Sequence, residues 1–360
     1  MQRWVRLRVN ELRSRTQREN SVKKHLTPLN RFAHSRTWRI KAGTVGLPGS
    51  IFLISAHVHA LEVVHLAIPT KSFQHVIYYL AQDRGYMEQS GIALKIQLIR
   101  PAASIQALMT NSVHFTLSGT SALIAASKGN APLKVVLAAN KNVLQWVLGG
   151  PKVTEVSALR GKQIATPGVA SVSTYIFKQV LAKNNLNPDQ DVVFFDPGPG
   201  NHLSTLLAGV ADAAILGAEQ KYIAVDSGMN ELSYLGREVK NSWGTLATSD
   251  RLIHEQPRLI SDFLKAALKS IRFIRRHRAA TIAAITKFAE VDAKLAGRVY
   301  DDLLNTFTHD GTVDEETQKN DLAVISHITG IDEPIPVARA YDFSQVRGAD
   351  RELTRAGWLP

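Results

Sequence analysis

The chain has 360 residues, of which 45% are hydrophobic, and this length and composition suit two ordinary globular domains. It contains no cysteine, which excludes disulfides, thiol catalysis and cysteine-ligated zinc. The formal net charge is +12, but residues 1–41 contain twelve Lys and Arg against two Glu and so carry most of it. Because the rest of the chain is close to neutral, we expect no nucleic-acid-binding surface on the folded body.

A charge-free segment follows the basic N-terminal run. Residues 42–60 contain no Asp, Glu, Lys or Arg and end in Val58-His59-Ala60, a pattern that is typical of a secretion signal. We therefore assign residues 1–60 to a basic leader and secretion signal, predict cleavage after Ala60 and expect the mature protein in the periplasm. The basic region is longer than in ordinary signals, so an uncleaved anchor, or a disordered tail before a buried strand, stays an alternative.

Strand-like and helix-like segments alternate through the first part of the mature chain. Apolar runs that end at Pro69 and Pro101 predict strands, and helical spacing of apolar residues, interrupted at Gly85 and Gly91, predicts helices. The expected order is strand 62–69, helix 72–91, strand 92–100, helix 103–110, strand 114–118, helix 120–128 and strand 132–140. This alternation predicts an α/β unit with a mostly parallel sheet flanked by helices.

The same alternation then starts again. The expected elements are a strand within 159–168, a helix over 171–186, a strand over 191–198, a helix and strand over 204–217 and a strand at 232–236. The sequence therefore predicts two α/β units in one chain.

After Pro257 the pattern is helical. Apolar residues from Ile260 to Ile274 form one stripe, and we interpret the basic residues between them as a solvated face. These basic residues are Lys265, Lys269, Arg272, Arg275 and Arg276. Further helical patterns cover 279–307 and 315–329, and the tail after Pro334 is expected to be irregular.

Two similar stretches occupy corresponding points of the two units, residues 106–119 and 204–217. We expect Gly209 to end a short helix in the left-handed conformation, and Asn111 to do the same in the earlier copy. Asp212 is interpreted as a structural residue whose carboxylate accepts backbone N–H groups of the turn. His114 stands where the aspartate would be, so the sequence leaves the chemistry of the first turn open.

Four segments together resemble the solute-binding proteins of nitrate/sulfonate/taurine-type ABC importers, a group that shares its domain with the thiamine-pyrimidine synthases. They are YYLAQDRGYMEQSGIALKI, ALMTNSVHFTLSGTSALIAASKGNAPLKVV, VSALRGKQIATPGVASVSTYIFKQVLAKNNL and LSTLLAGVADAAIL. Each is degenerate, but their order and spacing are specific. The resemblance covers roughly residues 63–275.

The resemblance implies a two-lobed periplasmic-binding-protein (type II) fold, with extra C-terminal helices and a solute held between the lobes. Lobe 1 would comprise residues 61–144 plus 243–360, and lobe 2 residues 145–242. The implied function is that of a monomeric, non-enzymatic, extracytoplasmic component of an ABC importer. It would capture a small anionic or heterocyclic organic solute and deliver it to a permease in the inner membrane.

The candidate ligand-binding residues follow predicted strands, where ligands of open α/β sheets bind. Hydroxyls and free N–H groups at a helix start, as in residues 118–121 and 171–174, suit a carboxylate, sulfonate or nitrate. Glu219 suits a cationic group or a brace of the hinge. The full set is Ser72, Phe73, Gln74, Ala103, Ser104, Ser118, Gly119, Thr120, Ser121, Asn140, Gln145, Ser171, Ser173, Thr174 and Glu219. The alternative for each is a structural role as an ordinary cap, turn or wall residue.

The residues that common catalytic and cofactor-binding motifs require are missing from this sequence. GPGNHL, residues 198–203, lacks the third glycine of a dinucleotide-binding fingerprint, and the chain has no Gly-x-Ser-x-Gly elbow. The twelve His include no close pair on one helix face, so we predict no metal, no cofactor and no catalytic residue. The related synthases use cysteines, which this chain lacks, and this argues against that enzyme. An enzyme of the thiamine-pyrimidine-synthase-like type on the same fold, or a ligand-sensing receptor domain, stays the alternative.

Overall fold

The computed structural model describes residues 60–359, which belong to one compact unit. The predicted leader and secretion signal, except for Ala60, lie outside the described residues. Within residues 60–359, no helix is both long and apolar enough to cross a membrane.

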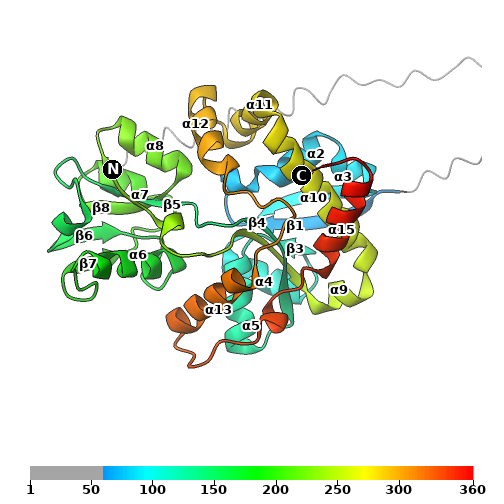
Figure 1. Cartoon of the computed structure of the whole chain (residues 1–360), viewed down its shortest axis with the longest axis horizontal. Coiled ribbons are helices and arrows are strands. Elements are labelled where there is room, and N and C mark those ends of the chain that lie inside the picture. Colours follow the sequence, from blue (N-terminus) through cyan, green and yellow to red (C-terminus); the bar gives the residue numbers. More distant parts are fainter. Residues whose placement is uncertain (1–59, 360) are drawn as a thin grey trace, which may run out of the picture. The chain divides into compact units, whose positions relative to one another are not determined.

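Two separate five-stranded sheets organise the chain, and helices flank both (Figure 1). The first sheet, in the order β2-β1-β3-β10-β4, contains β1 (Glu62–Ile68), β2 (Ile92–Leu98), β3 (Phe115–Thr116), β4 (Leu133–Asn140) and β10 (Trp243–Ser249). The second, in the order β7-β6-β8-β5-β9, contains β5 (Gln145–Gly149), β6 (Lys162–Ala165), β7 (Val192–Phe195), β8 (Ala213–Gly217) and β9 (Asn230–Tyr234). This arrangement confirms the predicted two-lobed α/β fold.

One strand in each sheet is antiparallel to both of its neighbours. These strands are β10, between β3 and β4, and β5, between β8 and β9. Each directly follows a segment in which the chain crosses from one sheet to the other, 141–144 for β5 and 235–242 for β10. We call the first sheet with its helices lobe 1 and the second lobe 2.

Apart from one short helix in the second crossing, the helices before the C-terminal region connect the strands of their own lobe. In lobe 1 they are η1 (Phe73–His75), α2 (Val76–Asp83), α3 (Tyr86–Gln89), α4 (Pro101–Met109) and α5 (Gly119–Gly129). In lobe 2 they are η2 (Val156–Leu159), α6 (Val172–Lys183), α7 (His202–Leu207), α8 (Ala218–Asp226) and η3 (Leu235–Arg237).

The C-terminal helices return to lobe 1. They are α9 (Asp250–Glu255), α10 (Pro257–Arg276), α11 (Arg278–Ala289), α12 (Ala293–Leu304), α13 (Glu315–Thr329), α14 (Val337–Ala340) and α15 (Ser344–Arg355). The apolar stripe of α10 is buried, and Phe263 stacks on Phe115 and Tyr78 of lobe 1 with ring centroids 4.3 and 5.8 Å apart. Burial of such aromatic and aliphatic surface stabilises the packing of α10 against lobe 1.

Two predictions for the C-terminal region are wrong. Arg272 is not on a solvated face but only 1% exposed, because it bonds to the Asp350 carboxylate and the Trp358 carbonyl. The tail after Pro334 is largely helical rather than irregular. Val346, Ala349 and Leu353 are buried along one side of α15 and recur at helical spacing among charged residues, so the amphipathic pattern of this helix is present in the sequence.

The repeated turns of the two lobes are built alike. Gly209 and Asn111 both have the expected left-handed conformation, with φ of 69° and 59°. The Asp212 carboxylate accepts a hydrogen bond of 2.9 Å from the backbone N–H of Gln163, which lies on the neighbouring strand rather than in the turn. His114 Nδ1 accepts the equivalent bond, 3.0 Å, from the N–H of His65. The histidine therefore replaces the aspartate as acceptor.

Candidate functional site

Two adjacent pockets of about 340 and 360 Å³ lie between residues of lobe 1 and residues of lobe 2. They share Gln74, Gln145, Pro167 and Trp243. Their remaining walls come largely from loops that follow β1, β3, β6, β7 and β8, at the carboxyl ends where ligands bind open α/β sheets. We call the first the Glu219 pocket and the second, lined by Ser118, Thr120, Ser121, Ser171 and Ser173, the serine pocket.

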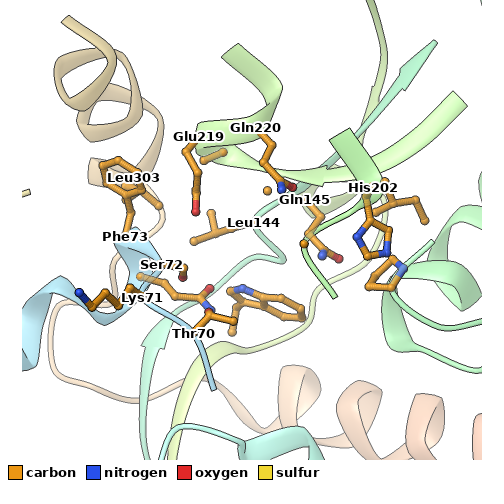
Figure 2. Close-up of a pocket in the computed structure, with 17 residues that line it drawn as sticks. Thr70, Lys71, Ser72, Phe73, Leu144, Gln145, His202, Glu219, Gln220 and Leu303 are labelled. Atoms are coloured by element: carbon orange, nitrogen blue, oxygen red, sulfur yellow. The ribbon is translucent and has the colours of Figure 1, made fainter. Parts of the chain in front are cut away.

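The carboxylate of Glu219 points into the first pocket (Figure 2). It lies in the first turn of α8, where the helix dipole favours a negative charge. Burial nevertheless raises the pKa of Glu219 above its ordinary value, and a hydrogen bond to its own backbone N–H opposes this only in part. Lys71 also lines the pocket, but its ammonium is 3.2 Å from the carboxylate of Glu290. The Glu219 carboxylate is therefore available to a donor from a ligand.

Aromatic and amide side chains surround the region that the two pockets share. Phe73 and Leu303 form an apolar wall opposite Gln145 (Figure 2), and Trp243 lines both pockets. The Gln145 carbonyl accepts a hydrogen bond from Ser173 Oγ, which fixes which end of the amide is free to donate. Such surroundings combine flat apolar contact with a few directed polar groups, as small-molecule sites do.

The serine pocket contains the starts of two helices. Ser171 caps α6 by accepting a hydrogen bond of 3.2 Å from Thr174 N–H. Ser118 precedes α5 but makes no side-chain cap, so the first N–H groups of α5 lack one. Free N–H groups at a helix start attract acceptor oxygens.

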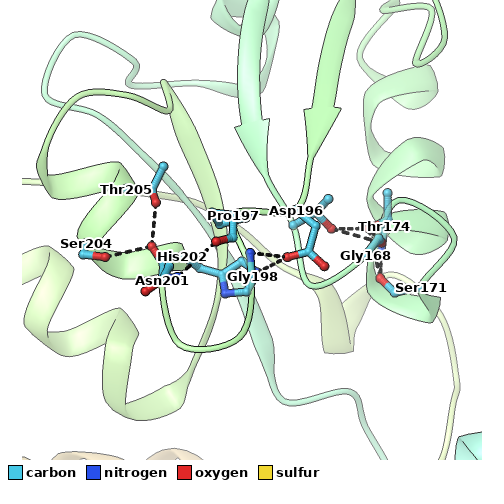
Figure 3. A network of polar contacts seen from close by, with 11 residues as sticks. Gly168, Ser171, Thr174, Asp196, Pro197, Gly198, Asn201, His202, Ser204 and Thr205 are labelled. Atoms are coloured by element: carbon cyan, nitrogen blue, oxygen red, sulfur yellow. Dashed lines mark hydrogen bonds and ion pairs between the residues drawn. The ribbon is translucent and has the colours of Figure 1, made fainter. Parts of the chain in front are cut away.

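A histidine and an aspartate lie together where the loop after β7 reaches the Glu219 pocket (Figure 3). His202 Nε2 is 3.6 Å from the Asp196 carboxylate, which accepts a hydrogen bond of 2.8 Å from Gly198 N–H. The 3.6 Å contact is too long for a hydrogen bond. Among residues 60–359, no three His, Asp or Glu side chains are grouped so as to hold a metal ion.

The structure brings most of the predicted ligand-binding residues to the two pockets. These are Ser72, Phe73, Gln74, Ser118, Gly119, Thr120, Ser121, Gln145, Ser171, Ser173 and Glu219. Whether they bind a ligand stays a prediction.

Four predicted residues do not line either pocket. Ala103 is exposed on α4, and Ser104 is buried with its hydroxyl donating to the Pro101 carbonyl. Asn140 is buried and donates to Thr306 Oγ1, and Thr174 is buried against Thr166 and the Gly168 carbonyl. The side chains of Ser104, Asn140 and Thr174 thus make hydrogen bonds within the fold.

Sequence reasoning missed several pocket residues. His202 lies in the segment GPGNHL, which does not match a dinucleotide-binding fingerprint. The position of this segment directly after a strand nevertheless indicates a place near a ligand site. Trp243 begins the strand that follows the second crossing. Leu303 comes from a distant C-terminal helix, and no local pattern indicates its position.

A family model described as NMT1/THI5 like matches residues 72–280. No curated protein sequence matches the chain.

Solved structures share the fold at low sequence identity. The putative periplasmic sulfonate-binding protein SsuA of a sulfonate ABC transporter from Methylobacillus flagellatus KT is 14% identical, with a TM-score of 0.68, and the match covers 84% of this chain and 98% of that one. The alkanesulfonate-binding protein SsuA from Xanthomonas axonopodis pv. citri, bound to MOPS, is 16% identical, with a TM-score of 0.63 and coverage of 78% and 98%. The desulfurization enzyme DSZB is 12% identical, with a TM-score of 0.62 and coverage of 82% and 99%.

Proposed function

The chain belongs to the NMT1/THI5-like family, and from this premise we propose that it is the extracytoplasmic solute-binding component of an ABC importer. It would capture a small organic solute between its lobes and deliver it to a membrane permease. The observation that carries the proposal is the Glu219 pocket, whose walls come from both lobes. A solute that contacts both walls favours the arrangement in which the lobes are close together. The two SsuA proteins, which have the same fold and are described as sulfonate-binding and alkanesulfonate-binding proteins, support this role.

The charges around the pockets favour a heterocyclic or amine-bearing solute over a simple anion. Among the described residues, no arginine lines either pocket, and Lys71 is paired with Glu290. An unpaired carboxylate repels a bare sulfonate or nitrate but accepts hydrogen bonds from an ammonium or a ring N–H. The uncapped start of α5 suits an acceptor oxygen at the other end of the same solute. We therefore propose a solute with an N–H donor at one end and an acceptor oxygen at the other.

Mass spectrometry of the protein purified under native conditions tests the proposal, because a tightly bound solute is retained. The recovered compound is then added back to stripped protein, and the shift of the melting temperature is measured. We expect stabilisation by the compound and by analogues that keep its N–H donor. If no compound is retained and a broad panel of amines, heterocycles and sulfonates leaves the melting temperature unchanged, the proposal is wrong.

We expect Glu219→Gln to weaken binding of that compound by roughly tenfold, because a hydrogen bond to a charged group is lost. Isothermal titration of both proteins measures the change.

The affinity of the wild-type protein should also depend on pH. Lowering the pH through the raised pKa of Glu219 neutralises the carboxylate and should weaken binding, as the substitution does. Glu155→Gln, an exposed change in lobe 2 away from the pockets, is the control and should bind normally. Equal affinity of the Glu219→Gln variant and the wild-type protein would show that the donor does not face Glu219.

An enzyme is the second candidate, because DSZB, which has the same fold, is described as a desulfurization enzyme. The two candidates differ in what becomes of the solute. A binding protein returns the compound unchanged after prolonged incubation, whereas an enzyme returns a product of different mass.

A further inference from the structure

Helices α8 of lobe 2 and α12 of the C-terminal region carry opposite charges that meet. Lys221 Nζ is 3.0 Å from Asp302 Oδ2, and the Tyr222 hydroxyl donates a 2.7 Å hydrogen bond to the same oxygen. One turn away, Arg298 donates to the Asp226 carboxylate at 2.6 Å. We call these five residues the interlobe latch.

Each side of the latch is fixed within its own lobe. Lys221 is only 8% exposed, its ammonium lies 4.6 Å from the centre of the Trp146 ring, and it is 3.3 Å from the Glu231 carboxylate of β9. On the other side, the Tyr300 hydroxyl of α12 donates a 2.8 Å hydrogen bond to the Ile274 carbonyl of α10. The Lys221 ammonium and the backbone of α12 are therefore held in place independently of the latch, and a fixed Lys221 side chain loses little entropy when the ion pair forms.

The latch adjoins the Glu219 pocket on both helices. On α8, Lys221 and Tyr222 follow Glu219 within one turn, and on α12, Asp302 precedes the pocket residue Leu303. A movement that separates Asp302 from Lys221 therefore also separates Leu303 from Glu219. The same contact thus adjoins both walls of the pocket.

We propose that Asp302 is a positioning residue for solute binding, which holds α8 against α12 and so keeps the two walls of the Glu219 pocket together before the solute arrives. The latch itself does not depend on the proposed function; only its effect on solute affinity rests on that function. Apparent affinity equals the intrinsic affinity multiplied by the fraction of protein in the competent arrangement, so loss of the latch would weaken binding without removing any solute contact.

Interlobe distances measured without solute test the proposal. The chain has no cysteine, so Lys128→Cys on α5 and Ala182→Cys on α6, both at least partly exposed, place one spin label on each lobe. In pulsed electron–electron double resonance we expect Asp302→Asn to add longer distances between the two labels. The ratio of the short-distance population to the long-distance population should fall roughly 5- to 30-fold. Asp302→Glu keeps the charge and should restore much of the short population.

Asp301→Asn is the matched control, since the neighbouring Asp301 pairs with Arg278 of α11, within the C-terminal helices. It should leave the distances unchanged. Tyr222→Phe removes one hydrogen bond to Asp302 and should give a smaller shift in the same direction, which keeps the test informative if Asp302→Asn does not fold. Wild-type distances in every folded variant would overturn the latch. Because no solute is used, that result leaves the proposed function standing, and a failed solute screen leaves the latch standing.

Discussion

Asp321→Ala is expected to lower the free energy of unfolding at pH 5 by about 3 kcal/mol, because it leaves several buried donors without an acceptor. The Asp321 carboxylate of α13 accepts hydrogen bonds from Asn241 Nδ2, Ser242 Oγ and the Tyr341 hydroxyl, at 2.7, 2.5 and 2.7 Å. It also accepts the backbone N–H of Ser242 at 3.0 Å. Residues 241 and 242 end the second crossing between the lobes, so the loss falls on the segment that joins lobe 2 to β10. Urea unfolding followed by circular dichroism measures it.

The effect of this substitution should depend on pH. Burial raises the pKa of Asp321 to about 6, and the hydrogen bonds from Ser242, Tyr341 and Asn241 oppose the rise. The folded protein thus keeps a proton that the unfolded chain releases near pH 4. The stability contributed by this proton is complete below pH 4 and disappears as the pH rises through 6, so the loss caused by Asp321→Ala should shrink by roughly 1 kcal/mol between pH 5 and 7.

Asp332→Ala is the control for both measurements, because Asp332 is exposed in the loop after α13. Its effect should stay within about 0.5 kcal/mol and should not vary over this pH range. A loss for Asp321→Ala that grows from pH 5 to 7 would mean that the carboxylate is stabilised in its charged form, contrary to the buried environment seen here.

The repeated alternation of strands and helices made the two lobes predictable, because period-two and helical spacing are local signals. The two reversed strands were harder. The residue patterns alone assigned no strand to Gln145–Gly149 or to Trp243–Ser249, since neither is separated from its neighbours by the helix that marks a parallel unit. Their place in the sheets depends on crossings that bring distant residues together.

The difference between local signals and distant contacts also separates the predicted site residues that line the pockets from those that do not. Loops after parallel strands meet at one edge of a sheet, so Ser118 and Glu219 could be placed near a ligand site by position alone. The direction of a side chain needs the phase of its element as well. Ser173 lines the serine pocket, whereas the next residue, Thr174, is buried against Thr166. Asn140 bonds to Thr306, a partner 166 positions away that no local pattern indicates.

Gly119→Ala should lower the free energy of unfolding by about 3 kcal/mol and deform the serine pocket, because α5 begins in contact with β10. A Cβ atom at Gly119 would lie 1.8 Å from Thr245 Oγ1 and 2.6 Å from Thr245 Cβ. The contact with Cβ means that rotating the threonine side chain does not relieve the clash, so the backbone of α5 or β10 must move. Both residues line the serine pocket, and the same movement should weaken binding of any retained solute.

Gly129→Ala supplies the comparison within the same helix. Gly129 is the last residue of α5, and a Cβ atom there would meet nothing within 4 Å. Because alanine restricts the unfolded chain more than glycine does, this change should be neutral or stabilise the protein by about 0.5 kcal/mol. Thermal and urea unfolding of the two variants isolate the effect of contact with Thr245 from the general effect of replacing a helical glycine. Equal stability of the two variants would show that α5 can move away from β10 at little cost, and the serine pocket would then be a deformable surface rather than a preformed one.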